Sequence, residues 1–196
     1  MLKTFYETKT YGNKWEQSPI QVDCQVVSVT GTEPVTVADA KEWGLIDTSA
    51  DDTVIGYMIK SVREALENYI SRDIIAKERK YYIEQAVQPI ALPFSPIALI
   101  SSVTYTRDAT ALVLNTDYYV DGLQNKVIDF SSYPKNYVTI TYTTSGITDQ
   151  SVKDSVKACF EYLYNSRGLV MMDNFKGFEI PQTSKYLINN WKKVVF

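Results

Sequence analysis

The sequence contains no histidine. Histidine is the commonest general base near neutral pH and a frequent zinc ligand, so its absence excludes Ser-His-Asp catalysis, Cys-His catalysis and histidine-bound zinc. The two common phosphate-binding patterns, G-x-x-x-x-G-K-S/T and G-x-G-x-x-G, are also missing. Cys24 and Cys159 are the only cysteines, and they are too few and too far apart for a disulfide framework or a zinc site. We predict that both are structural.

Carboxylates offer the remaining route to catalysis, as in glycosidases and magnesium-dependent nucleases. The densest acidic group is Asp47, Asp51 and Asp52. It lacks the alternating ligands, central glycine and final glutamate of a calcium-binding EF-hand loop. Because it precedes a strong helical pattern, capping of the helix N-terminus is the favoured interpretation. We therefore predict no enzymatic activity, no cofactor and no metal.

Long apolar runs and a basic surplus are absent as well. The longest apolar stretches are short, such as residues 97–100, whereas a bilayer-spanning helix needs roughly 20 residues. The first five residues lack the apolar core of a signal peptide. The net charge is −3, from 20 basic and 23 acidic residues, while proteins that grip nucleic acid through phosphates usually carry excess positive charge. We expect a protein made in the cytoplasm, with no membrane partner.

Three segments have helical patterns. Thr36 and Asp39 form a capping-box-like pair before a short helix that ends at Gly44. The clearest helix runs from about residue 51 to 71, and another runs from about 149 to 166. Intervals of three and four define the predicted buried face of the clearest helix, which carries Val54, Ile55, Met58, Ile59, Val62, Leu66, Tyr69 and Ile70. Its predicted solvent face carries Lys60, Arg63, Glu64, Glu67 and Asn68.

Between residues 76 and 142 the apolar period changes to two. β-Branched and aromatic residues dominate there, and turn-forming residues separate the runs. This pattern predicts an antiparallel meander, so the chain as a whole is predicted to be α+β. The expected strands lie near 82–83, 103–106, 118–121, 126–130 and 137–142, and a further strand is expected within residues 20–29.

Tyrosine is unusually frequent, at 15 of 196 residues. Its large apolar face and polar tip are enriched where proteins meet proteins. Half-exposed strands also favour tyrosine. The composition leaves both interpretations open.

Taken in order, these segments resemble the head–tail connector (adaptor) family of tailed bacteriophages. The order and spacing of three stretches carry the likeness, which covers about residues 35–168. The family usually has a Gly-Tyr-like pair after the last strand, where this chain has Thr143–Ile147. The first stretch is residues 35–47 with Asp51 and Asp52; the second is the helix end 65–72; the third comprises 90–93, 117–120, 138–142 and the helix end 164–168.

The resemblance implies a small helical core with an inserted antiparallel β-sheet at residues 35–168. Outside the likeness, the sequence itself predicts an extended N-terminal arm at 1–34 and a C-terminal docking tail at 169–196. The resemblance also implies a non-catalytic structural protein of the virion neck, assembled in the host cytoplasm. Twelve copies would form a ring under the portal protein and dock the stopper or tail protein. Genomic DNA would pass through the ring without sequence-specific binding.

We hypothesise that the tail from residue 169 grips the portal. It follows a complete-looking domain, and ordering it costs about 1–2 kcal/mol per residue for the backbone alone. Only a large apolar contact offsets that cost. In the alternative interpretation, the tail folds back on its own domain. The candidate docking residues are Phe175, Phe178, Tyr186, Leu187, Trp191 and Phe196.

Two other functions remain open. A carboxylate-dependent hydrolase acting on glycans or nucleic acid would need two or three acidic side chains that converge in a cleft. Another neck or tail-completion protein of the virion would need a similar small domain that assembles with other proteins.

Overall fold

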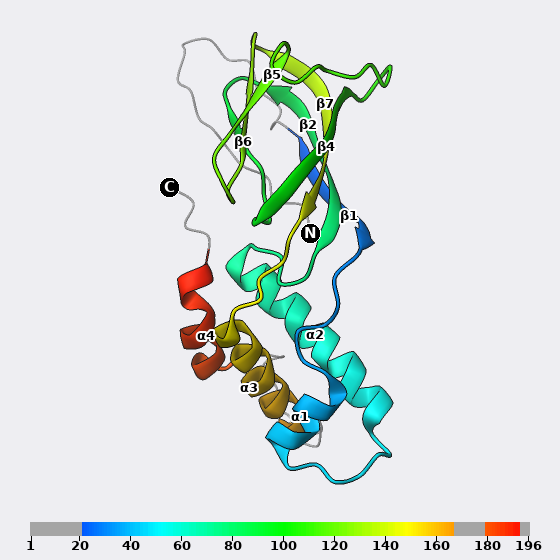
Figure 1. The fold of residues 1–196 in the computed structure, drawn as a ribbon, viewed down its shortest axis with the longest axis vertical. Helices are drawn as coiled ribbons and strands as arrows, with labels where there is room; N and C mark the ends of the chain where they lie inside the picture. The colour runs from blue at the N-terminus through cyan, green and yellow to red at the C-terminus, as the bar shows by residue number, and fades with distance from the viewer. Residues whose placement is uncertain (1–20, 167–178, 193–196) are drawn as a thin grey trace, which may run out of the picture. The chain divides into compact units, whose positions relative to one another are not determined.

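The computed structural model describes residues 21–166 and 179–192. The chain divides into two compact units (Figure 1). The β unit comprises Met1–Thr30 and Lys77–Ser145, and the helical unit comprises Gly31–Ala76 and Gly146–Phe196. The longer segment of the β unit thus lies between the two halves of the helical unit in the sequence. This arrangement confirms the predicted α+β class, a helical core with an inserted antiparallel sheet.

The helical unit contains four α-helices and one short 3-10 turn in its described residues. Helix α1 spans Val37–Gly44, α2 Asp52–Ile70, α3 Gln150–Ser166 and α4 Gln182–Ile188, and the turn η1 spans Asn189–Trp191. The boundaries of α1, α2 and α3 agree with the sequence patterns to within about two residues, which is the usual uncertainty of helix ends.

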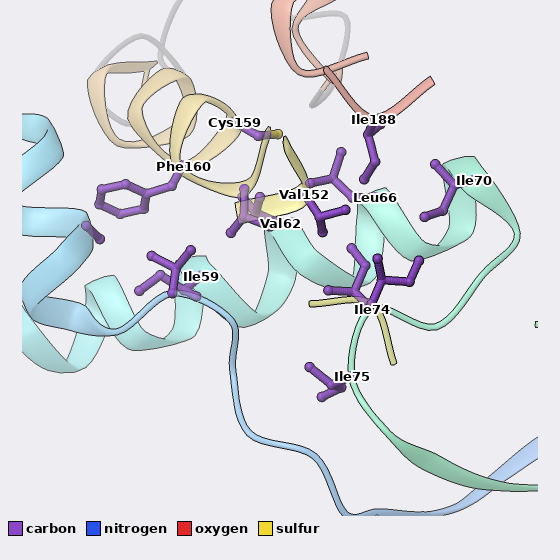
Figure 2. Close-up of a cluster of buried hydrophobic side chains, with 14 of the residues drawn as sticks. Ile59, Val62, Leu66, Ile70, Ile74, Ile75, Val152, Cys159, Phe160 and Ile188 are labelled. Atoms are coloured by element: carbon purple, nitrogen blue, oxygen red, sulfur yellow. The ribbon is translucent and has the colours of Figure 1, made fainter. Parts of the chain in front are cut away.

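One apolar core holds the helical unit together (Figure 2). Buried side chains along α2 meet those of α3, and Ile188 at the end of α4 belongs to the same core. The intervals of three and four put these α2 residues on one face. Val54 was predicted on that face but is 44% exposed, because it lies beside the buried stripe. The stripe consists of Ile55, Ile59, Val62, Leu66 and Ile70.

The N-terminus of α1 is capped as predicted. The Asp39 N–H donates to Thr36 Oγ1 at 3.1 Å, and the Thr36 N–H donates to the Asp39 carboxylate at 2.9 Å. Hydrogen bonds from the Thr36 backbone and then its hydroxyl lower the pKa of Asp39. This reciprocal pair satisfies two N–H groups that have no partner within the helix.

The predicted side-chain cap of α2 was wrong. Asp51 is the N-cap residue, but its side chain makes no cap hydrogen bond. Its backbone has φ −99° and ψ 1° rather than the extended conformation of most N-caps. The Asp51 carboxylate accepts a hydrogen bond from the Tyr164 hydroxyl at 3.0 Å, and Asp52 pairs with Lys41 at 2.8 Å. These carboxylates therefore tie α2 to α3 and α1.

Arg63 and Glu67 are buried, although the sequence placed them on the solvent face of α2. Their side chains are only 2% and 3% exposed. Arg63 Nη1 donates to Glu67 Oε2 at 2.6 Å, and Arg63 Nε donates to Glu33 Oε2 at 2.8 Å. The pKa of Arg63 is raised; burial alone would lower it, but the hydrogen bond to Glu33 and the charges of Glu67, Glu33 and Glu64 outweigh that effect. Buried charges persist when they are paired and hydrogen-bonded, which the sequence periodicity does not show.

The second oxygen of Glu67 holds the segment that follows α2. Oε1 accepts the backbone N–H groups of Ile74 at 2.9 Å and Ile75 at 3.4 Å. The Ile74 carbonyl in turn accepts the N–H of Ile147, and the Ala76 carbonyl accepts the N–H of Gly31, both at 2.9 Å. Three chain segments that lead to or from the β unit are therefore hydrogen-bonded to one another within the helical unit.

Two glycines allow these segments to approach closely. A Cβ atom at Gly31 would lie 2.5 Å from the nitrogen of Ala76, and one at Gly146 would lie 2.8 Å from the oxygen of Ile74. Gly146 also has a φ of 75°, which side-chain-bearing residues rarely adopt. A larger residue at either position would force the backbones apart.

The described residues of the β unit form two antiparallel sheets. The first has the order β1-β2-β7-β4, with β1 at Val22–Val29, β2 at Lys77–Ala86, β7 at Lys135–Thr144 and β4 at Ile97–Tyr105. The second has the order β3-β6-β5, with β3 at Ile90–Ala91, β6 at Val127–Phe130 and β5 at Tyr118–Asp121. Residues from both sheets, such as Ile140 and Ile128, share one apolar core.

Antiparallel pairing was predicted correctly, but the meander order was wrong. Strand β7 lies between β2 and β4 instead of at the end of the sheet. Its Val138, Ile140 and Tyr142 alternate with half-buried residues and are each 0% exposed. A central strand suits this pattern, because both of its edges are paired and one face is fully buried.

We predict that Glu67→Gln lowers the free energy of unfolding by about 3 kcal/mol, because it leaves the buried Arg63 guanidinium without its closest charge. Urea unfolding followed by circular dichroism measures the change. Glu64→Gln is the matched control, since Glu64 also pairs with Arg63 but its side chain is 52% exposed, and its effect should stay below about 1 kcal/mol. Equal losses in the two variants would contradict the assigned role of Glu67.

We also predict opposite effects for two glycine substitutions. Gly146→Ala should lower the free energy of unfolding by more than about 1 kcal/mol, because of its positive φ and the contact with the Ile74 oxygen. Gly56→Ala should raise it by about 0.5–1 kcal/mol, because Gly56 lies inside α2 and its added Cβ would meet only Val37, at 3.9 Å. Thermal unfolding shows whether each variant is more or less stable than the wild type. A stabilising Gly146→Ala would contradict the close approach of residue 146 to the Ile74 oxygen.

Candidate interaction surfaces

The structure describes three of the six predicted docking residues. Phe175, Phe178 and Phe196 lie outside the described residues. Tyr186 on α4 is 81% exposed, Leu187 is half-buried, and Trp191 in η1 packs partly against the helical core. Among these three, Tyr186 alone presents most of its side chain to a partner.

Helix α4 is attached to the rest of the helical unit. Ile188 is fully buried in the core, and the Ser155 hydroxyl on α3 donates to the Ser184 carbonyl at 2.9 Å. The Lys192 ammonium lies 4.3 Å from the centre of the Tyr69 ring on α2. Residues 180–192 therefore fold back on the helical unit, which is the arrangement expected under the alternative interpretation of the tail. It leaves the exposed side of α4, with Tyr186, available for docking.

Exposed apolar side chains occur elsewhere on the helical unit. Leu45, at the end of α1, is 88% exposed and adopts a left-handed backbone with φ 52°. The neighbouring Trp43 is 44% exposed, and its indole N–H donates to Glu161 of α3 at 2.9 Å. Tyr57 on α2 is 69% exposed. Sequence reasoning missed this group, because a single exposed leucine or tyrosine leaves no periodic signal.

The β unit also exposes apolar residues. Leu123 is 90% exposed and Leu99 is 60% exposed. The edge strand β1 exposes Val26, Val27 and Val29. Scattered exposed apolar residues are normal on a monomer, but consecutive ones on an edge strand are typical of contact surfaces.

The tyrosines support both interpretations of their number. Tyr118 and Tyr142 are buried in the β unit, where Tyr142 Oη donates to the Pro93 carbonyl at 2.8 Å. Tyr57, Tyr162 and Tyr186 are largely exposed on the helical unit. Tyrosine therefore fills the sheet core and also supplies exposed aromatic surface.

The acidic trio does not form a common site. Asp47 is exposed, Asp51 accepts from Tyr164, and Asp52 pairs with Lys41. Across residues 21–166 and 179–192, no group of three or more Cys, Asp or Glu side chains is placed to hold a metal ion. The positions of these carboxylates do not provide the converging pair that a hydrolase needs.

The two cysteines lie in different environments. Cys159 is buried in the helical core, and burial raises the pKa of its thiol to about 11, although a hydrogen bond with Ser184 acts in the opposite direction. The thiol therefore stays protonated at neutral pH and packs as a small apolar group. Cys24 is half-buried and forms no disulfide, and its Sγ lies 3.8 Å from both the Tyr142 hydroxyl and Arg79 Nη1. No helix in the described part is long and apolar enough to cross a bilayer.

Three solved chains from gene transfer agent particles have a similar fold. A chain in the neck of an empty particle computed with C6 symmetry aligns with a TM-score of 0.68 and 15% identity, covering 89% of this chain and 97% of that one. A chain from the virion of the native particle aligns with a TM-score of 0.65 and 13% identity, covering 88% of this chain and 96% of that one. A chain from the neck of the native particle computed with C12 symmetry aligns with a TM-score of 0.64 and 13% identity, covering 89% of this chain and 97% of that one. No curated protein matches the sequence.

A family model also matches the sequence itself. The model is described as phage gp6-like head-tail connector protein, and it matches residues 34–133. The match begins just before α1, includes α2 and continues through strands β2 to β6. It covers more than half of the chain, so this protein belongs to the phage gp6-like head–tail connector family.

Proposed function

We propose that the chain is a structural head–tail adaptor subunit of the virion neck, which forms a ring under the portal, extends the DNA channel and docks the stopper or tail protein. Its membership of the head–tail connector family carries this proposal. The likeness to neck chains of gene transfer agent particles over nearly nine-tenths of the sequence supports it.

A ring of identical subunits needs two different faces on each copy, so that one face meets the other and the rotation closes the circle. The similar neck chains belong to particles computed with C6 and C12 symmetry, which supports a ring of twelve copies. Exposed apolar residues on both units, including Leu45, Tyr57, Leu99 and Leu123, supply candidate contact area. Avidity across twelve copies allows each contact with a partner to be weak.

The charge of the chain suits a channel wall better than a DNA-binding site. A net charge of −3 provides no surplus to neutralise phosphates, so genomic DNA would slide past without being held. The adaptor would act by shape and docking, without catalysis. The dispersed carboxylates and the protonated Cys159 thiol are consistent with that role.

The C-terminal segment from residue 169 is the proposed portal contact. Tyr186 is the candidate anchor that the structure describes, because it combines 81% exposure with attachment to the core through the neighbouring Ile188. An aromatic side chain has only two rotatable bonds and therefore loses little conformational entropy on binding, and tyrosine is enriched among interface hot spots.

Mixing the purified chain with portal rings of the same virus tests the proposed function. Negative-stain electron microscopy should show an added ring at the narrow end of each portal. Bare portals, with both proteins shown to be folded, would contradict the adaptor function and favour another neck or tail-completion role.

We predict that Tyr186→Ala weakens portal binding at least tenfold, equal to about 1.4 kcal/mol, a loss that only a minority of interface residues cause when truncated. Its melting temperature should stay unchanged, because the side chain is mostly in solvent. Thr183→Ala is the matched control, an exposed position on the same helix, and should bind like the wild type. Deleting residues 169–196 is a poorer test, since it would also remove Ile188 from the core.

Wild-type affinity of Tyr186→Ala, measured by sedimentation with portal rings, would refute the role of Tyr186. A comparable loss in Thr183→Ala would show that the effect belongs to α4 in general.

A further inference from the structure

Arg72 has an unusual position just after α2. Ser71 ends the helix in a left-handed conformation, and the Arg72 N–H donates to the Glu67 carbonyl at 3.2 Å. The side chain is half-buried, and its Nε atom is buried without a hydrogen-bond partner. Within residues 21–166 and 179–192, no carboxylate pairs with its guanidinium.

This environment contrasts with that of Arg63, which lies within α2. Arg63 pairs with Glu33, Glu64 and Glu67, and the remaining oxygen of Glu67 is taken by backbone N–H groups. A buried guanidinium nitrogen without a partner destabilises the subunit, because the donor loses its water and gains nothing in return. Burial accordingly lowers the pKa of Arg72, with no opposing charge. A methionine of similar length would pack there without that penalty.

The guanidinium of Arg72 carries a positive charge that no carboxylate of the described residues neutralises. Burial of its Nε atom keeps water from one edge of the guanidinium. Such a group is complementary to an anionic partner.

A protein carboxylate fits Arg72 better than a DNA phosphate. DNA is held by several cations that project into solvent, whereas Arg72 is set back into the protein with one edge buried. The planar guanidinium binds a carboxylate through parallel hydrogen bonds when water is excluded around it. Another copy of the chain offers suitable groups, because the side chains of Glu42, Asp47 and Asp121 are exposed and pair with no other side chain among the described residues.

We propose that Arg72 is an assembly contact that pairs with a carboxylate of the neighbouring copy. The proposal rests on the ring assembly of the proposed function. A heterologous contact brings one face of a copy against a different face of the next, so a cation of one chain can meet a carboxylate of another. The pair compensates in the ring for the partner that Arg72 lacks in the isolated subunit.

Comparison of Arg72→Met with Lys60→Met in the full-length chain tests this contact. Both variants remove one positive charge, but Lys60 is exposed on α2 and has no ion pair among the described residues. Arg72→Met should melt at or above the wild-type temperature and should weaken ring formation at least tenfold, measured by sedimentation and by counting copies on portals. Lys60→Met should assemble like the wild type. A lower melting temperature for Arg72→Met, or unimpaired assembly, would overturn the proposal.

A zero-length cross-link identifies the partner. Arg72→Lys keeps the charge and supplies an amine that a carbodiimide joins to a carboxylate in direct contact. In a mixture of isotope-labelled and unlabelled chains, mass spectrometry should find residue 72 joined to an aspartate or glutamate of another copy. Cross-linking only to the portal, only within one chain, or not at all would overturn the proposal.

The two proposals fail in different ways. Wild-type chains that leave portals bare refute the adaptor function, while self-association and cross-linking of the chain alone still decide the role of Arg72. Wild-type chains that decorate portals, together with an Arg72→Met variant that decorates them equally well, refute only the Arg72 contact. A wild-type chain that stays monomeric with and without portals refutes both.

Discussion

The carboxylate of Glu67 is the contact on which the described helical unit depends most. One oxygen neutralises the buried Arg63, and the other accepts the N–H groups of Ile74 and Ile75. Carbonyls of the same segment accept the N–H groups of Gly31 and Ile147. One side chain therefore holds the segment at which the chain passes from the helical unit into the β unit. A charge buried this deeply is stable because it is paired with a cation and hydrogen-bonded to backbone N–H groups.

Much of the fold follows from local patterns in the sequence, but the pairing of distant segments does not. The apolar intervals predict α1, α2 and α3, and the capping box at Thr36 marks a helix start correctly. The same periodicity wrongly places Arg63 and Glu67 in solvent, because it classifies residues by polarity and does not include their partners. The strands are recognisable, yet the position of β7 between β2 and β4 depends on long-range pairing that no local signal specifies.

The candidate surfaces show a similar division. An aromatic-rich C-terminal segment is visible in the sequence, and the structure separates its members into the exposed Tyr186 and the core-packed Trp191. The exposed Leu45 and the unpartnered Arg72 leave no sequence signal, since each is unusual only in its surroundings. For a family whose members join other virion proteins, such residues are better guides to function than a catalytic cluster would be.

The most direct test of the adaptor account is a cryo-electron microscopy map of the neck of the virion that contains this chain. The account predicts twelve copies in one closed ring between the portal and the next tail component, with the exposed side of α4 toward the portal. A map that locates the chain in the tail tube, in the capsid shell or at a different copy number without a closed ring would contradict it.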